Sequence, residues 1–206
     1  MDVNNAFLNG DFVETMYMAQ PEGFVNAATA THVCRLRKSL HGLKQTPCTW
    51  YNKLKEALIK WGIIRSVSDA SLFIKQTDEY VLFVLVYVDD ILLTGCNSAA
   101  LNACIHDLDH HFSLKTLGAV NYFLRFEVYR NKTGLYLSQT KYIVDLLKKA
   151  WMEDCKPCDT PMTAGLSLTN EAEEFPNPVV YKTIIGSLQY LTYTRPDTAF
   201  VVNKLS

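Results

Sequence analysis

The chain has 206 residues, of which 49% are hydrophobic and 20% are charged, and its net charge is −1. These values exclude an extensively disordered chain and a uniformly basic nucleic-acid binder. The longest apolar run, residues 81–88, is too short to span a bilayer, and no cationic leader precedes an apolar core. We therefore expect a soluble, intracellular protein without a membrane partner.

The first ten residues place a carboxylate, Asp2, near the start and end in an Asn-Gly turn. A strand that ends at Asp2 needs residues before it to pair, so we expect the chain to be a fragment. Pro and Gly predict a loop over residues 17–24, and partial alternation predicts a short strand over residues 33–40.

Residues 33–62 are locally basic, with seven Lys or Arg and one Glu, a balance of +6. Apolar positions from Trp50 to Trp61 recur at helical spacing, and Gly62 ends this predicted helix. Cations interleaved with aromatic residues could follow a phosphate backbone. A solvated helix face with its aromatic residues in the core is an equal alternative.

Residues 71–76 predict a strand, and residues 80–95 predict a hairpin that carries Asp89 and Asp90 at its tip. The β-branched valines of the first run favour a buried strand over a helix. Two adjacent carboxylates repel each other unless a cation lies between them, and a divalent metal is the usual solution. The alternative is an ordinary polar turn, in which Asp is common.

The second half predicts helices over residues 98–112, with Ser98 as cap, 140–151 and 179–192, and a further helix begins near Pro196. Alternation over residues 121–131 predicts one strand, followed by a turn and a second short strand. Prolines and glutamates mark residues 155–178 as a linker. The six cysteines should be reduced, although a zinc site from four side chains is conceivable: Cys155, Cys158, His106 and His110.

Five stretches, in order, resemble the reverse transcriptase of copia-type LTR retrotransposons. They are Met-Asp-Val-Asn-Asn-Ala-Phe-Leu-Asn-Gly-Asp at 1–11, Ser-Leu-His-Gly-Leu-Lys-Gln-Thr-Pro at 39–47 with Trp50-Tyr51, Leu-Val-Tyr-Val-Asp-Asp-Ile-Leu at 85–92, Tyr-Phe-Leu-Arg-Phe-Glu-Val at 122–128 and Leu-Thr-Tyr-Thr-Arg-Pro-Asp at 191–197. The resemblance covers nearly the whole chain and implies a fragment of a Pol polyprotein with RNA-directed DNA polymerase activity.

The resemblance implies an α+β fold, in which a polymerase palm combines an antiparallel sheet with packed helices. The palm would occupy residues 1–138 and include the primer-grip hairpin. A thumb-like helix over 139–162, a linker over 163–178 and a truncated helical connection toward ribonuclease H over 179–206 would follow. The family's fingers segment would be absent.

The resemblance also assigns roles to individual residues. Asp2, Asp89 and Asp90 would be the catalytic residues and would hold two Mg²⁺ ions, with Mn²⁺ as an alternative. Phe7, Gln45 and Tyr87 would contact the incoming nucleotide, and Lys44, Leu124 and Arg125 the primer and template. The ring of Phe7 would exclude a 2′-hydroxyl, although Phe7 as ordinary core is the alternative.

The partners implied are an RNA template, a DNA primer, deoxynucleoside triphosphates and the integrase and ribonuclease H segments of Pol. Three residues depart from the family pattern: Cys48 replaces a common Arg, Arg125 a usual Gly and His41 a common Tyr. Such changes are typical of a decaying genomic copy. We therefore expect little or no polymerase activity from this chain alone, and the alternative function is a catalytically dead remnant that at most binds nucleic acid.

Overall fold

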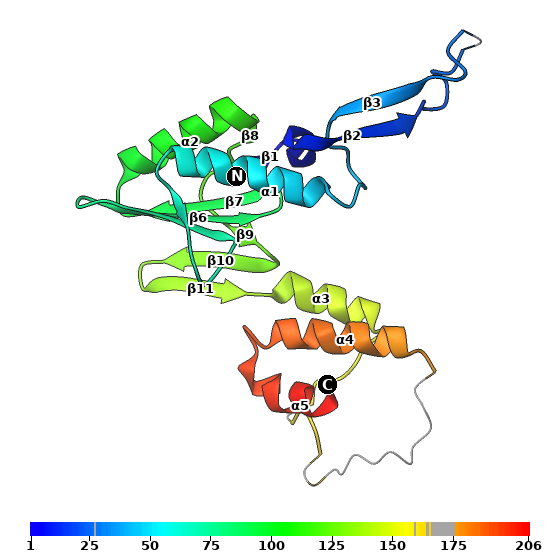
Figure 1. Cartoon of the computed structure of the whole chain (residues 1–206). Coiled ribbons are helices and arrows are strands. Elements are labelled where there is room, and N and C mark those ends of the chain that lie inside the picture. Colours follow the sequence, from blue (N-terminus) through cyan, green and yellow to red (C-terminus); the bar gives the residue numbers. More distant parts are fainter. Residues whose placement is uncertain (27, 159, 164, 166–175) are drawn as a thin grey trace. The chain divides into compact units, whose positions relative to one another are not determined.

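The computed structural model describes residues 1–26, 28–158, 160–163, 165 and 176–206, and the chain divides into two compact units, Met1–Gly118 and Ala119–Ser206 (Figure 1). Every strand pairing in the described parts is antiparallel, and five α-helices accompany the strands, so the expected α+β class is confirmed. Residues 119–138, expected to belong with the preceding residues, cluster with the helices of the second unit. Most of the expected linker lies outside the described residues.

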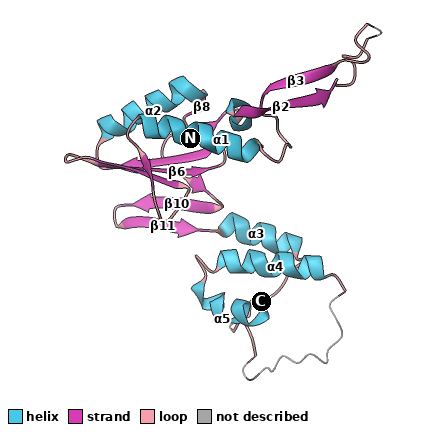
Figure 2. Cartoon of the chain, in the orientation of Figure 1, coloured by secondary structure: helices cyan, strands magenta, loops and turns pink. Residues whose placement is uncertain are grey.

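A six-stranded sheet forms the centre of the first unit (Figure 2). In spatial order its strands are β4 (Ile64–Arg65), β5 (Leu72–Gln76), β6 (Val81–Tyr87), β7 (Asp90–Gly95), β1 (Asp2–Val3) and β8 (Leu114–Lys115). The helices α1 (Thr46–Lys60) and α2 (Ser98–Phe112) pack on one face of this sheet. Within the first unit, the described α-helices therefore cover one face of the sheet and leave the other face open.

Strand β6 shows this division along its length. Leu82, Val84 and Val86 are buried, whereas Phe83 and Tyr87 are exposed. The apolar run thus has one buried face, although its composition predicted a fully buried strand. The two helices complete the core with side chains that are at most 3% exposed: Trp50, Leu54, Leu58, Leu108 and Phe112.

Two local predictions in the first unit are wrong. Strand β2 (Asp11–Ala19) continues into the predicted loop because it pairs with β3 (Val33–Lys38), a contact that no local pattern announces. The cap of α2 is Asn97, whose side-chain oxygen accepts from the amide of Ala100 at 3.0 Å. Asn97 has extended backbone dihedrals, as an N-cap requires, whereas Ser98 is already helical.

The second unit begins with a three-stranded sheet of β9 (Tyr122–Phe123), β10 (Phe126–Asn131) and β11 (Gly134–Ser138). The continuous strand predicted over residues 121–131 is wrong, because a two-residue turn at Leu124 and Arg125 reverses the chain. Both residues have positive φ, 47° and 65°. A turn of this kind favours Gly or Asn, so two larger residues here store backbone strain.

Contacts within the second unit hold this turn. The hydroxyl of Tyr190 donates to the carbonyl of Leu124. The guanidinium of Arg125 lies 5.1 Å from the ring centre of Tyr142, a cation–π distance. Both tyrosines come from helices, α3 (Thr140–Lys149) and α4 (Pro178–Leu191), so helical packing compensates part of the strain.

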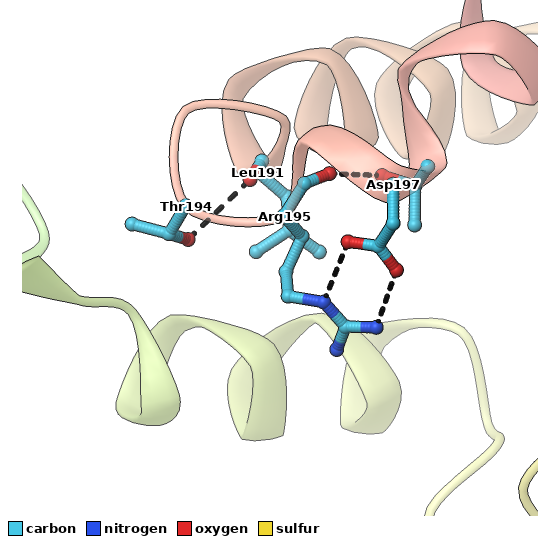
Figure 3. A network of polar contacts seen from close by, with 5 residues as sticks. Leu191, Thr194, Arg195 and Asp197 are labelled. Atoms are coloured by element: carbon cyan, nitrogen blue, oxygen red, sulfur yellow. Dashed lines mark hydrogen bonds and ion pairs between the residues drawn. The ribbon is translucent and has the colours of Figure 1, made fainter.

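The segment after α4 leads into a short 3₁₀ turn and α5 (Ala199–Leu205). Figure 3 shows its polar contacts, where Arg195 donates to both carboxylate oxygens of Asp197 at 3.0 and 2.8 Å. The hydroxyl of Thr194 also donates to the buried side chain of Gln139 at 2.7 Å. The bond between Thr194 and Gln139 ties the chain after α4 to the start of α3. Within the described residues, no helix is long and apolar enough to cross a membrane.

We expect Gly95→Ala to destabilise the first unit by about 1–3 kcal/mol. A Cβ at Gly95 would lie 2.7 Å from the carbonyl oxygen of Val81, and a backbone atom cannot rotate away. Urea unfolding followed by circular dichroism measures the change. The control is Gly186→Ala in α4, where a Cβ meets no atom within 4 Å and the better helix former should preserve or raise stability. Unchanged stability in the Gly95 variant would contradict the close approach.

Candidate active site

Backbone pairing brings the first carboxylate to the hairpin. Asp2 of β1 lies directly opposite Asp90 of β7 in the antiparallel ladder. The amide of Val3 donates to the carbonyl of Asp89, and the amide of Ile91 to that of Met1, both at 2.9 Å. Directly opposed residues project from the same face with Cβ atoms roughly 5 Å apart. The side chains of Asp2 and Asp90 are therefore neighbours.

The hairpin predicted between residues 80 and 95 is present. Tyr87 pairs with Asp90, so Val88 and Asp89 alone form the turn. Val88 has φ of 55°, a left-handed conformation that is unfavourable for a β-branched residue. Asp89 is exposed at the tip. Since Tyr87 is exposed and opposes Asp90, both lie on the open face of the sheet, which no described helix of the first unit covers.

The three carboxylates interact electrostatically. Burial, followed by the charges of Asp89 and Asp2, raises the pKa of Asp90 above its ordinary value. Each negative charge makes ionisation of the next less favourable. A cation placed among the three would remove this cost.

The donor chemistry of the three carboxylates fits Mg²⁺, which prefers hard oxygen ligands. In the described parts of the chain, no group of three or more His, Cys, Asp or Glu side chains is arranged to hold an ion by itself. Mg²⁺ commonly binds through one or two carboxylates and takes its other ligands from water and substrate phosphates. The same finding gives no support to the zinc site considered for Cys155 and Cys158 with His106 and His110.

A cleft of about 540 Å³ opens beside the turn. Its walls come from the short helix after β1, the segment before α1 and the turn itself: Asn5, Ala6, Phe7, Leu8, Leu40, His41, Val88 and Asp89. The rings of Phe7 and His41 lie 5.3 Å apart. Phe7 is half-buried, packs against the core and lines the cleft, and its contact with a sugar remains a prediction.

The other predicted site residues are more dispersed. Lys44 and Gln45 are exposed just before α1, and neither lines the cleft beside Asp89. Leu124 and Arg125 form the strained turn of the second unit. Their contact with primer and template remains a prediction.

Two relations at this site were not predicted from the sequence. Lys115 of β8 lies directly opposite Asp2, so a cation extends the row formed by Asp90 and Asp2 across three strands. The indole N–H of Trp50 donates to the carbonyl of Val88 at 2.6 Å. Neither relation has a local signal, because each depends on residues distant in the sequence.

Residues 1–164 match the family described as reverse transcriptase (RNA-dependent DNA polymerase). The chain belongs to this family. Its relatives place it among the copia-type members, as the five sequence motifs indicated.

Similar proteins include the retrovirus-related Pol polyproteins from transposons RE1 and RE2 of Arabidopsis thaliana, each 45% identical over the whole chain. The Pol polyprotein from transposon TNT 1-94 of Nicotiana tabacum is 37% identical over the whole chain. This reverse transcriptase chain spans 14% of the length of each Arabidopsis relative and 16% of the tobacco one. No solved structure matches the chain.

The raised pKa of Asp90 predicts a pH dependence of stability. The folded state binds this proton more tightly than the unfolded chain, so ionised Asp90 destabilises the fold at neutral pH. This cost declines as the pH falls through the raised pKa and is lost below about pH 3.9. In a chelator, Asp90→Asn should therefore unfold at higher urea than the native chain at pH 7, and the difference should vanish in acid.

Asp69→Ala provides a control of opposite sign. Hydrogen bonds from Ser71 lower the pKa of Asp69, so this carboxylate stabilises the fold at neutral pH and loses its effect as the pH falls. The control should be less stable than the native chain at pH 7. A pH-independent difference for Asp90→Asn would show that Asp90 acts by packing and not by charge.

Proposed function

We propose that this chain is the catalytic portion of an RNA-directed DNA polymerase that transfers deoxynucleotides to a primer. The observation that supports this most strongly is the register of Asp2 against Asp90, beside Asp89 at the mouth of a cleft. Three carboxylates from two adjacent strands suit two-metal phosphoryl transfer. The family membership supports the same reaction.

Asp2 and Asp89 would be the principal ligands of two Mg²⁺ ions, and Asp90 would support them. When bound, the ions lower the pKa of the primer 3′-hydroxyl and neutralise charge on the nucleotide's phosphates. The pKa of Asp90 is raised by burial and by the charges of Asp89 and Asp2, so a bound cation would offset this effect and stabilise the carboxylate. Lys115, opposite Asp2, adds a positive charge that suits an anionic substrate.

The cleft beside Asp89 is the proposed place of the incoming nucleotide. Its volume of about 540 Å³ is within the range of small-molecule sites. Phe7 would contact the sugar, and Gln45 and Tyr87 would contact the nucleotide from the margins. The ring of Phe7 is packed against the core, which would keep it from yielding to a 2′-hydroxyl.

The remaining assignments extend the proposal to the whole chain. The first unit would supply the palm, α3 a thumb-like element, and Lys44, Leu124 and Arg125 contacts to primer and template. RNA template, DNA primer, deoxynucleoside triphosphates and the other Pol segments would be the partners. Divalent metal, as Mg²⁺ or Mn²⁺, would be the cofactor.

A catalytically dead remnant is the second candidate, and the turn at Arg125 favours it. Arg125 has φ of 65°, where the family usually has Gly, so the substitution strains the hairpin proposed to hold the primer. Cys48 also removes a common cation from the exposed start of α1. Both changes would weaken nucleic-acid contacts while leaving the three carboxylates in place.

Primer extension separates the two candidates. On a poly-rA template, with the chain joined to the fingers and ribonuclease H segments of a Pol polyprotein, we expect Mg²⁺-dependent incorporation that Asp89→Asn reduces at least about a hundredfold. Asp69→Asn is the matched control, because Asp69 is an exposed loop carboxylate bound to Ser71. Absence of incorporation from the unsubstituted chain would favour the remnant, and equal rates in the two variants would remove Asp89 from catalysis.

Phe7→Val should relax the choice of sugar in the same assay. Removing the ring would open space in the cleft for a 2′-hydroxyl, so the preference for deoxynucleotides should fall by roughly 10- to 100-fold. The ratio of kcat/KM for deoxythymidine and uridine triphosphates measures this preference. His41→Ala is the comparison, since His41 lines the same cleft. An unchanged ratio in Phe7→Val would leave Phe7 as a core residue only.

A further inference from the structure

The turn that carries Asp89 has an unfavourable backbone. Val88 has φ of 55°, and a β-branched residue in this region costs about 1–3 kcal/mol. Such a conformation persists only where surrounding contacts enforce it. The contacts that do so determine where the exposed carboxylate of Asp89 points.

Both carbonyls of the turn accept hydrogen bonds from other elements. The Asp89 carbonyl accepts from the amide of Val3 in β1 at 2.9 Å, which links it to the strand that carries Asp2. The Val88 carbonyl accepts from the indole N–H of Trp50 in α1 at 2.6 Å. The first bond continues the sheet, whereas the second comes from a side chain and has no counterpart in the ladder.

The indole of Trp50 is a rigid donor. Its side chain is 2% exposed, and its ring meets the edge of Phe112 with centres 5.2 Å apart at 90°. The ring therefore cannot follow the turn if the turn moves. Because α1 and α2 form the core with the sheet, the bond anchors the hairpin tip to the interior of the unit.

We propose that Trp50 is a positioning residue for the active site, whose N–H holds the Val88 carbonyl and thereby fixes Asp89 at the cleft. The inference rests on the proposed function, because a fixed Asp89 matters through the metal it would hold. A Phe at position 50 would fill much of the core but would leave the turn with one anchor. By this proposal the indole fills the core, and its N–H holds the turn that carries the Asp89 carboxylate.

Binding of Mn²⁺ to the full chain tests the proposal, with free ion measured by electron paramagnetic resonance. Trp50→Phe should weaken the affinity by about 10- to 100-fold, the range found for residues that orient metal ligands. Trp61→Phe is the matched control, because Trp61 packs beside His111 and should leave the affinity unchanged. Asp89→Asn should abolish Mn²⁺ binding at this site, so it shows which part of the measured binding depends on Asp89.

A second substitution separates positioning from packing. Benzothienylalanine at position 50 keeps the size of the indole and replaces only the N–H by sulfur, so it also serves if Trp50→Phe fails to fold. Weakened Mn²⁺ binding with a near-native urea midpoint supports the proposal. Native affinity in the benzothienylalanine protein overturns it while leaving the proposed function intact. No Asp89-dependent binding in the unsubstituted chain overturns both.

Discussion

The pairing of β1 with β7 is the constraint on which the site depends. It sets the side chain of Asp2 beside that of Asp90 on the open face of the sheet, where like charges repel. The backbone bonds of the ladder and the helices packed behind it compensate for this repulsion. An arrangement that is costly without a cation, yet built into the sheet, supports the proposed metal site.

The cost is distributed between charge and backbone. The raised pKa of Asp90 reflects the electrostatic cost, and the positive φ of Val88 reflects the backbone cost. Two hydrogen bonds to the carbonyls of the turn offset the backbone cost, one from β1 and one from Trp50. The hairpin tip is therefore held from two sides, although its carboxylate is exposed.

Features with a local signal could be predicted from the sequence. The helices α1 and α2 follow apolar spacing, and the β6–β7 hairpin follows valine-rich runs around an acidic turn. Features that lack a local signal could not be predicted from the sequence. Strand β2 exists through pairing with β3, and the turn at Leu124 and Arg125 lacks the Gly or Asn that marks such turns.

The candidate site divides in the same way. Asp89 and Asp90 attract attention as neighbours, whereas the association of Asp2 with them came from family resemblance and not from any spacing. Lys115 was found by neither approach, because it lies on a two-residue strand. Trp50 belongs to one of the family stretches, but it has the spacing and burial of an ordinary core residue, so the hydrogen bond of its N–H was not predicted. Tertiary pairing decides these positions, and a single sequence does not reveal it.

Strand β1 can pair only with strands that are made later in synthesis. This strand is two residues long, and both of its partners, β7 and β8, are translated much later. Until β7 has been synthesised, Asp2 has no partner strand, and its second partner, Lys115 of β8, follows later still. Contacts between segments so distant in the sequence form slowly, so the acidic centre is completed only after the β6–β7 hairpin is available to β1.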